Sequence, residues 1–148
     1  MQPKNPDYEK RVRENFALQT ALSSIGAEMV KVLPGATEIH LHYRDSLTQQ
    51  HGYVHGGVIA TIADTACGYS AMSLVSAGSE VLTVEFKINF VNPARGDLFI
   101  ARGRVKKAGR TLTICEGEVL SGETTIAVML ATVMTVSAGL TGKVAAPK

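Results

Sequence analysis

The spacing of apolar residues predicts a helix at the start of the chain and a half-buried strand soon after it. Between residues 7 and 25, apolar side chains recur at helical intervals, as in the i, i+4 pair Val12 and Phe16. Gly26 follows as the expected terminator, because glycine readily adopts the left-handed conformation that ends many helices. Between residues 37 and 43, apolar and polar residues alternate, which predicts a strand with one buried face.

A much longer apolar stretch runs from Gly57 to Ala77. Its apolar side chains fall on nearly every side of a helix, so we expect a helix that is buried all round and ends at Gly78. About 20 residues at about 1.5 Å each give this helix a length of roughly 30 Å. Such a helix needs neighbours on several sides, and the rest of the chain must supply them.

Four strand-like segments complete the pattern, at residues 81–91, 97–107, 111–121 and 124–136. Short connections between the later segments predict hairpins, so we expect the four strands to form an antiparallel meander. The predicted fold is α+β, with an antiparallel sheet wrapped around the long helix. In the first of these strands, strict alternation places Leu82, Val84, Phe86, Ile88 and Phe90 on one face and Thr83, Glu85, Lys87 and Asn89 on the other.

Length and composition fit one small domain. The chain has 148 residues, 45% of them hydrophobic, and we expect an N-terminal helix (1–26) packed on a domain (27–136) and a disordered tail (137–148). A net charge of +2 is too small to indicate a nucleic-acid-binding protein. The polar N-terminus does not fit a secretory signal, and no apolar run reaches the roughly 18 residues of a membrane span. With Cys67 and Cys115 as free thiols, we expect a cytoplasmic protein.

Asp64 is the only charged residue within the long apolar stretch. An unpaired buried carboxylate is strongly disfavoured, so this residue needs a partner or a function. Small residues lie one turn away on each side, Ala60 and Gly68, and they leave space for a ligand. We interpret Asp64 as a catalytic candidate beside a cavity. The alternative is a structural aspartate held by the backbone or by the hydroxyl of Thr61 or Thr65.

The start of the same helix carries a second candidate, the pair Gly56 and Gly57. Helix N-termini present free N–H groups and partial positive charge, and glycines let another molecule approach, a combination that stabilises an oxyanion. The alternative is a flexible entry to the helix. Gly57 and Asp64 lie about 10 Å apart along the axis, too far to touch one carbonyl. If both serve one site, two antiparallel copies of this helix must meet in a symmetric dimer.

Three segments combine into a specific pattern. The first reads Gln49-x-x-Gly52-x-x-His55-Gly56-Gly57 and is followed after six residues by Asp64. The second runs from Thr83 to Ala94. The third reads Gly109-Arg110-Thr111-Leu112. Together they resemble the signature of the phenylacetate-degradation (PaaI-like) type of acyl-CoA thioesterase, which has the hotdog fold. The resemblance covers about residues 47–136, and it is specific for the family but not for a substrate.

This resemblance implies a role for each motif residue. Asp64 would act as nucleophile or general base, and the Gly57 N–H would polarise the thioester carbonyl. Gln49 would orient water or substrate, His55 would be a positioning residue, and Thr83 would place a hydroxyl near the site. Substrate and CoA would contact Gly56 and two turns, at Asn92, Pro93, Ala94, Arg95, Gly109, Arg110, Thr111, Leu112 and Thr113. Arg95 and Arg110 fit phosphate contacts, with ordinary surface charge as the alternative.

The resemblance implies no metal, no cofactor other than the CoA of the substrate, and a homodimer that assembles into a homotetramer. Two other functions stay open. Hotdog domains also serve as hydroxyacyl dehydratases, in which a histidine and an acid converge on the substrate, here His55 and Asp64. A non-catalytic acyl-CoA-binding module is the other alternative, although it would not need Asp64. Met72 and Tyr69 are candidates for the wall of an acyl cavity, but the sequence does not define the acyl group.

Overall fold

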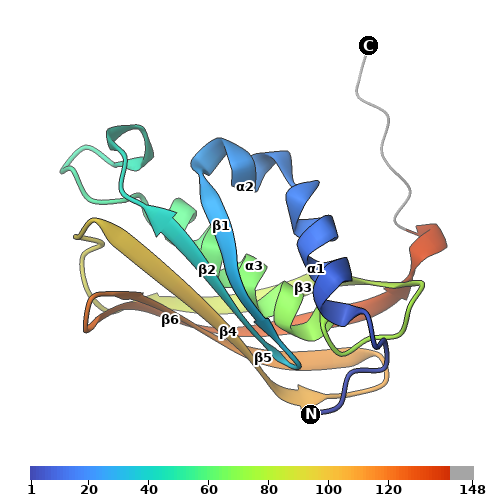
Figure 1. The fold of residues 1–148 in the computed structure, drawn as a ribbon. Helices are drawn as coiled ribbons and strands as arrows, with labels where there is room; N and C mark the ends of the chain where they lie inside the picture. Colours follow the sequence, from blue (N-terminus) through green and yellow to red (C-terminus); the bar gives the residue numbers. More distant parts are fainter. Residues whose placement is uncertain (141–148) are drawn as a thin grey trace.

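The computed structural model describes residues 1–140, and Figure 1 shows how their helices and strands are arranged. Two short helices, α1 (Tyr8–Ala17) and α2 (Thr20–Ile25), precede the strands β1 (Ala27–Leu33) and β2 (Ala36–His42). The long helix α3 (Gly56–Met72) leads to β3 (Ser79–Phe90), β4 (Leu98–Ala108), β5 (Leu112–Ser121) and β6 (Thr124–Ser137). Single 3₁₀ turns cover Asp45–Leu47 and Ala138–Leu140. The rest of the predicted tail, 141–148, lies outside the described residues.

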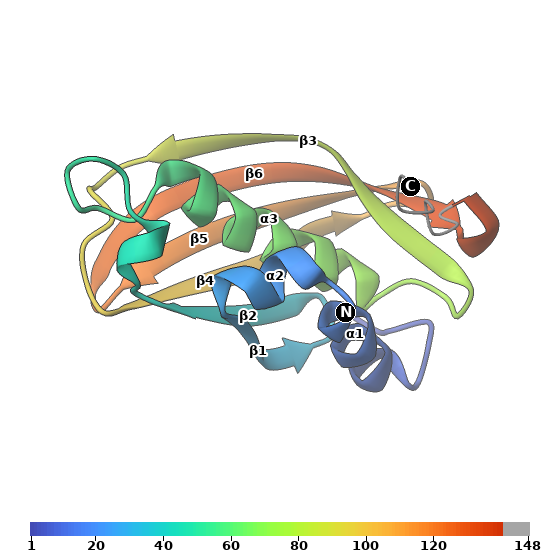
Figure 2. The same cartoon turned by 90° about the horizontal axis from the view of Figure 1, so that it is seen from above.

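One antiparallel sheet curves around α3, which confirms the predicted arrangement of a sheet wrapped around a central helix. The strand order is β1-β2-β4-β5-β6-β3, so β1 and β3 form the two edges. In Figure 2, α3 runs along the sheet between these edges, and α1 and α2 lie over it. The sheet therefore supports α3 on one side, and α1 contacts it on the other.

The predicted meander of four strands is wrong in one respect, because β3 pairs with β6 and not with β4. Only β4, β5 and β6 form a meander. β4 lies between β2 and β5, and its first residue, Leu98, is level with His42 of β2. The connection of residues 91–97 makes this possible, because it is tied at one end to Ile126 and at the other to Tyr43. As a result, β3 is an edge strand.

Two glycines in the sheet let α3 approach it closely. A Cβ atom at Gly103 would lie 2.3 Å from the carbonyl oxygen of Ala66, so the backbone of α3 passes directly over β4. At Gly117, a Cβ atom would lie 3.0 Å from Cys67 Sγ. The Thr37 hydroxyl adds a hydrogen bond to the Ala66 carbonyl at 2.8 Å. These contacts fix the depth and rotation of α3, and therefore the direction in which its other side points.

Helix α3 ends earlier than the apolar pattern predicts, at Met72 instead of Ala77. The Ser73 hydroxyl donates to the Ser70 carbonyl and accepts the Gly35 N–H, both at 2.7 Å, which ties the helix end to the β1–β2 turn. The next two residues, Leu74 and Val75, are buried although they are no longer helical. The apolar run therefore continued beyond the helix because the turn that follows also belongs to the core.

One side of α3 is not covered by the part of the chain that the structure describes. It carries a stripe of residues that are exposed or half-buried: Gly57, Ala60, Thr61, Asp64 and Gly68. Their spacing of three or four positions places them on one side of the helix. The expectation that the helix is buried all round is therefore wrong for a single chain, and the open side contains both catalytic candidates.

The N-terminal segment forms two helices, where the sequence predicts a single helix over residues 7–25. The chain becomes extended at Gln19, and Gly26 ends α2 in the left-handed conformation (φ 74°), as predicted. α1 packs onto the domain through the fully buried Val12 and through Phe16, whose ring meets the Tyr69 ring edge-on at 5.8 Å. The break at Gln19 turns its side chain toward Tyr69, because Gln19 Nε2 donates to the Tyr69 hydroxyl at 2.7 Å.

Candidate active site

An irregularity in β3 decides which of its side chains face α3. The strand pairs regularly with β6 except at Val84, the extra residue between Thr83 and Glu85 in a β-bulge. Side chains directly opposite one another in an antiparallel pair lie on the same face of the sheet. Thr83, opposite the buried Val133, therefore faces α3, whereas Glu85, opposite Thr132, faces away.

This bulge corrects the alternation that the sequence predicts for the strand. Beyond the bulge, Phe86 pairs with the buried Ala131 and also faces α3. Thr83 and Phe86 therefore share a face, although strict alternation places them on opposite faces. The extra residue shifts the alternation by one position, so each side chain beyond the bulge faces the opposite way from the one that strict alternation predicts. Bulges near functional sites often redirect a side chain in this way. Here the bulge directs Thr83 toward Asp64.

Asp64 lies half-buried in the middle of α3. Thr83 donates a hydrogen bond from Oγ1 to Asp64 Oδ1 at 2.8 Å. Burial raises the pKa of Asp64 above its ordinary value of 3.8, and the hydrogen bond from Thr83 partly offsets that rise. A poorly solvated carboxylate with a raised pKa is a stronger base and nucleophile than one in water.

The two threonines that could have held Asp64 in a purely structural role do not bond to it. The Thr61 hydroxyl donates to the Gly57 carbonyl at 2.8 Å, and the Thr65 hydroxyl donates to the Thr61 carbonyl at 2.7 Å. Both hydroxyls are therefore satisfied by the backbone of their own helix. The second carboxylate oxygen, Oδ2, has no protein partner within residues 1–140.

A pocket of about 140 Å³ opens beside Asp64. It lies between α3, the start of β3 and the N-terminal segment, and it is open to solvent. Its lining consists of Asn15, Gln19, Asp64, Thr65, Gly68, Tyr69, Met72, Glu80, Val81 and Thr83. A larger hollow of about 900 Å³ lies over the sheet, but none of the predicted site residues line it. Of these two hollows, only the smaller one is lined by Asp64 and Thr83.

At its N-terminus, α3 presents backbone donors to solvent, but one of them is already used. His55 is the N-cap residue, and its Nδ1 accepts the N–H of the exposed Gly57 at 2.9 Å. The Phe90 ring lies against Gly56, where a Cβ atom would come within 3.2 Å of the ring. A carbonyl oxygen that uses the Gly57 donor must therefore share it with His55 or displace the imidazole.

The structure does not bring Gly57 and Asp64 together within one chain. They lie about 10 Å apart along α3, and Gly57 does not line the pocket beside Asp64. Gln49 also lies outside that pocket. Its N–H donates to the Tyr53 carbonyl at 2.8 Å, and its side-chain oxygen accepts the N–H of His51, so Gln49 closes its own loop.

The first turn predicted to contact CoA, residues 92–96, lies beside the loop that leads into α3. The Ala94 carbonyl accepts the Val54 N–H at 3.1 Å. The Arg95 guanidinium lies over the Tyr53 ring, 4.7 Å from its centroid, and also bonds to the Tyr53 hydroxyl. These contacts hold the turn at the N-terminal end of α3, where an anion would meet both Arg95 and the helix terminus.

Two further hydrogen bonds fix the shape of this turn. The Asn92 side-chain amide donates to the Thr125 carbonyl at 2.9 Å, and the Arg95 N–H donates to the Pro93 carbonyl at 2.8 Å. Asn92 therefore serves the turn itself in a single chain, and its amide contact links the turn to β6.

The second turn predicted to contact CoA, residues 109–113, lies at the opposite end of the sheet. Leu112 is level with Met134 of β6, which is level with Leu82 near the start of β3. The turn 92–96 follows the other end of β3, so about 25 Å separates the two turns along the strand. Gly109 closes the hairpin by donating its N–H to the Leu112 carbonyl at 2.9 Å. Arg110, Thr111 and Leu112 are exposed, and Thr113 is buried.

Four residues of the pocket were not singled out by the sequence: Asn15, Gln19, Glu80 and Val81. Asn15 and Gln19 are spaced one helical turn apart in a segment expected to pack on the domain. This spacing is the only feature of the sequence that could have indicated their place in the pocket. Met72 and Tyr69 line the pocket, as expected for the wall of an acyl cavity. The pocket is thus more polar than the apolar character of the long helix suggests.

Thiolate and metal chemistry find no support in the described part of the chain. Cys67 and Cys115 are buried and unpaired, and burial raises the pKa of Cys115 to about 12 and that of Cys67 still further. Among residues 1–140, no group of three or more His, Cys, Asp or Glu side chains is placed to hold a metal ion. No helix over the same residues is long and apolar enough to cross a membrane.

Comparisons with known proteins agree with this architecture. The family described as the thioesterase superfamily matches residues 51–128. The crystal structure of a thioesterase family protein from Silicibacter pomeroyi is similar at 45% sequence identity and a TM-score of 0.86, over 88% of this chain and 98% of that chain. The E. coli PaaI protein, from the phenylacetic acid degradation operon, shares the fold at 18% identity and a TM-score of 0.83, over 90% and 96% of the two chains.

Two sequence relatives carry names that bear on chemistry. A provisionally named esterase from Halobacterium salinarum is 32% identical over 105 residues, which are 68% of this chain and 69% of its own. A 1,4-dihydroxy-2-naphthoyl-CoA hydrolase from Listeria monocytogenes is 26% identical over 93 residues, which are 63% of this chain and 76% of its own.

Proposed function

Because the chain belongs to the thioesterase superfamily, we propose that it hydrolyses acyl-CoA thioesters to a free acid and CoA beside Asp64. The observation that carries this proposal is the half-buried Asp64 carboxylate, which lines a pocket and whose pKa is raised by burial. A relative named as an acyl-CoA hydrolase supports a CoA thioester as the substrate. The motif from Gln49 to Asp64 supports the phenylacetate-degradation type within the superfamily.

The carboxylate can act by either of two routes. As a general base, Asp64 takes a proton from water while the water oxygen attacks the thioester carbon. As a nucleophile, it attacks that carbon itself, and water then hydrolyses the resulting anhydride. In both routes the carbonyl oxygen becomes an oxyanion, the C–S bond breaks, and the CoA thiolate takes up a proton. A thiol pKa of about 8.5 makes thiolate a good leaving group without a strong acid.

We propose that the oxyanion is held by the Gly57 N–H of a second subunit, because one chain cannot place both groups on one carbonyl. The open stripe along α3, from Gly57 through Asp64 to Gly68, consists of small and polar residues. Two such stripes packed antiparallel would place Gly57 of each subunit near Asp64 of the other. His55 keeps the Gly57 donor in position until the thioester oxygen takes its place.

The edge strand β3 supports the same homodimer. Edge strands that expose apolar side chains are templates for pairing with another chain. Four large apolar side chains of this strand are between 43 and 52% exposed: Leu82, Val84, Phe86 and Phe90. Antiparallel pairing of two β3 edges would extend the sheet across the dimer and bring the two α3 helices side by side.

The same antiparallel pairing explains the distance between the two predicted CoA turns. In one chain, residues 92–96 and 109–113 lie at opposite ends of β3. In the proposed dimer, each turn would approach the other turn of the partner, so one CoA would be held by both subunits. Arg95 and Arg110 would then meet its phosphates. We extend this assembly to a tetramer in the cytoplasm, as the family resemblance implies.

The contacts of His55 favour hydrolysis over dehydration. A dehydratase needs a histidine and an acid that converge on the substrate, but His55 Nδ1 accepts the N–H of Gly57 and His55 is not among the pocket residues around Asp64. A binding module without activity would have no use for a desolvated carboxylate with a raised pKa. Hydrolysis is the function that uses the Asp64 carboxylate and its raised pKa.

An assay of CoA release over a panel of short, long and aromatic acyl-CoAs tests the proposal. We expect turnover with the wild type and a loss of at least about 10³-fold in kcat with Asp64→Asn. Asp45→Asn, an exposed aspartate outside the pocket, is the matched control and should keep full activity. Binding without CoA release would identify a binding module, hydration of an enoyl-CoA would identify a dehydratase, and wild-type kcat in Asp64→Asn would remove Asp64 from the mechanism.

A further inference from the structure

One end of the pocket beside Asp64 is built from polar side chains that the proposed hydrolysis does not use. Asn15 and Gln19 come from the N-terminal segment, Tyr69 from α3 and Glu80 from the start of β3. Asn15 and Gln19 lie outside residues 51–128, the part of the chain that matches the superfamily. The N-terminal segment therefore adds a wall of its own to the pocket.

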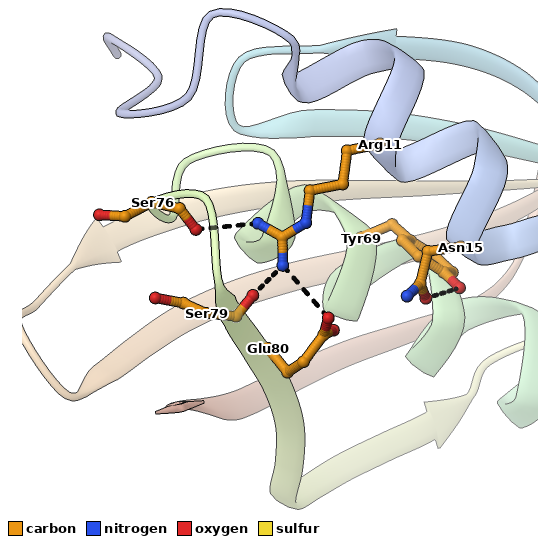
Figure 3. A network of polar contacts seen from close by, with 6 residues as sticks. All are labelled: Arg11, Asn15, Tyr69, Ser76, Ser79 and Glu80. Carbon is orange, nitrogen blue, oxygen red and sulfur yellow. Dashed lines mark hydrogen bonds and ion pairs between the residues drawn. The ribbon is translucent and has the colours of Figure 1, made fainter. Parts of the chain in front are cut away.

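The two amides are held in place by a single hydroxyl. Tyr69 donates to Asn15 Oδ1 at 2.9 Å and accepts from Gln19 Nε2 at 2.7 Å, and Figure 3 shows the Tyr69–Asn15 contact. Burial raises the pKa of Tyr69 to about 12, so the hydroxyl keeps its proton. Each amide keeps its other polar group, Asn15 Nδ2 and Gln19 Oε1, which have no protein partner within residues 1–140. These groups offer one donor and one acceptor to a ligand in the pocket.

The helix that carries Asn15 is fixed to the pocket by Arg11. Its guanidinium donates to the carbonyl of Ser76 at 2.9 Å, to the carbonyl of Ser79 and to the Glu80 carboxylate at 3.3 Å (Figure 3). Arg11 and Glu80 are mostly buried, with 19 and 26% of their side chains exposed. Arg11 balances Glu80, whereas Asp64 has no such cation, so the pocket carries an excess of negative charge.

The size of the pocket limits the group that fits. Its volume is about 140 Å³ in a single chain, close to the roughly 150 Å³ of a cavity known to hold a benzene molecule. Tyr69 lies five residues beyond Asp64, about 7.5 Å along α3. An acyl group with its carbonyl at Asp64 and about one ring or a six-carbon chain in the pocket would place its far end near the two amides.

We infer that Asn15 and Gln19 recognise the far end of the acyl group, and that the substrates are acyl-CoAs of about this size that end in an uncharged hydrogen-bonding group such as a hydroxyl. This inference rests on the proposed hydrolysis. A methyl end would leave the two amide groups without partners, which is unfavourable in a partly buried site. A carboxylate end would enter a pocket whose net charge is already negative, because Arg11 balances Glu80 but Asp64 has no such cation. The N-terminal segment thus selects the substrate, while α3 performs the chemistry.

Two matched substrate series test this inference with the full-length protein. One series is hexanoyl-CoA, 6-hydroxyhexanoyl-CoA and adipoyl-CoA, and the other is 4-methylbenzoyl-CoA, 4-hydroxybenzoyl-CoA and terephthaloyl-CoA. Within a series, only the far end changes. We expect kcat/KM to be about tenfold higher for the hydroxyl than for the methyl compound in the better series, as one neutral hydrogen bond provides, and lowest for the carboxylate compound.

Gln19→Met and Asn15→Leu keep the size of each side chain but remove its polar group. We expect each to lower the ratio of hydroxyl to methyl kcat/KM by about fivefold to tenfold, and thermal unfolding verifies that each variant is folded. Leu18→Ala, an exposed apolar residue between them (70% exposed), is the control and should leave the ratio unchanged. Either amide variant alone suffices if the other fails to fold.

The outcomes separate this inference from the proposed function. Absence of CoA release from all six compounds and from the broader acyl-CoA panel overturns the proposed function itself. Turnover with a hydroxyl-to-methyl ratio near one, or with a ratio that neither amide variant changes, overturns the role of Asn15 and Gln19 and leaves hydrolysis intact. A preference for the carboxylate compound contradicts the charge argument built on the unbalanced Asp64.

Discussion

Helix α3 carries one half of the proposed chemistry at its N-terminus and the other half in its middle, and the two surroundings differ in kind. Gly57 is exposed, and its N–H is already donated to His55. Asp64 is half-buried, and burial raises its pKa in spite of the hydrogen bond from Thr83. The pKa of the carboxylate is thus already raised within a single chain, whereas the backbone donor is occupied by His55.

This difference indicates what a second subunit has to contribute. A hydrogen bond to an oxyanion is strong only where water is excluded, and the N-terminal end of α3 is open to solvent in one chain. Covering that end with a partner would strengthen the donor at the moment when the thioester oxygen arrives. The pocket at Asp64 needs less from the partner, because α1, α3 and β3 already provide walls for it.

Removing the donor gives the largest effect that separates the two regions. Gly57→Pro deletes the N–H in the first turn, where proline is tolerated, and we expect kcat to fall by about 10²- to 10³-fold, the usual loss for one oxyanion donor. Gly57→Ala keeps the N–H, although its Cβ would lie 3.1 Å from His55 Nδ1, and it should lose much less. Equal activities in the two folded variants would show that the N–H has no role.

Mixing two inactive variants tests whether the two regions belong to different subunits. Gly57→Pro and Asp64→Asn, unfolded and refolded together in equal amounts, should regain about a quarter of wild-type activity. Half of the dimers would then contain both variants, and one of the two sites in each of them would have an intact Gly57 and an intact Asp64. If the mixture stayed as inactive as its components, the shared site would be wrong.

The sequence predicts these two regions because each depends on local signals. Asp64 is conspicuous as a charge in an apolar helix, and Gly57 as a glycine at a helix start. The partner of β3 and the bulge at Val84 could not be predicted, because both depend on pairing with a distant part of the chain: Thr83 is opposite Val133, 50 residues further on. The wall formed by Asn15 could not be predicted either, because the helix breaks at Gln19 without a glycine or proline to signal it, and the Tyr69 hydroxyl that Gln19 contacts lies 50 residues away in the sequence.

Placing a charge on the open edge of β3 should separate the subunits and expose both regions. Val84 is 52% exposed in one chain, and charged side chains on an edge strand block pairing. We expect Val84→Lys to sediment as a smaller species and to lose more than about tenfold in kcat/KM at low protein concentration, with recovery at high concentration. Leu18→Lys, at an exposed apolar position on the N-terminal segment, should change neither. A monomer with full activity would be incompatible with a composite site.

Removing the Thr83 hydroxyl should change the pH dependence set at Asp64. Thr83→Val deletes the hydrogen bond that lowers the pKa of this carboxyl, so burial acts unopposed and the pKa rises further. Because the carboxylate is the active form, the acid limb of kcat/KM should move to higher pH, with activity falling about tenfold per pH unit below it. Thr83→Ser keeps the hydroxyl and should keep the wild-type profile. An unshifted limb in Thr83→Val would contradict the coupling.

The stability of the fold should respond in the corresponding direction. A carboxyl whose pKa is raised in the folded state binds its proton more tightly there than in the unfolded chain. Stability therefore falls as pH rises from 3.8, the ordinary value, through the raised pKa. Asp64→Asn has no charge to desolvate, so its unfolding temperature should lose this dependence, as thermal denaturation between pH 3 and 8 would reveal.

The smallest effect is expected at His55. Its variants test whether this residue only caps α3 or also takes part in catalysis. His55→Ala removes the Nδ1 acceptor of the Gly57 N–H, and loss of an N-cap costs about 1 kcal/mol, or about 2 to 4 °C in Tm for a chain of this size. His55→Asn supplies another good N-cap and should restore Tm. In both variants the Gly57 N–H remains available to the substrate, so kcat should fall by less than about tenfold. The contrary outcome is a loss of turnover in both variants although Tm recovers in His55→Asn. The imidazole would then be a proton-transfer group, and the exposed end of α3 would contribute both this group and the Gly57 N–H to the chemistry.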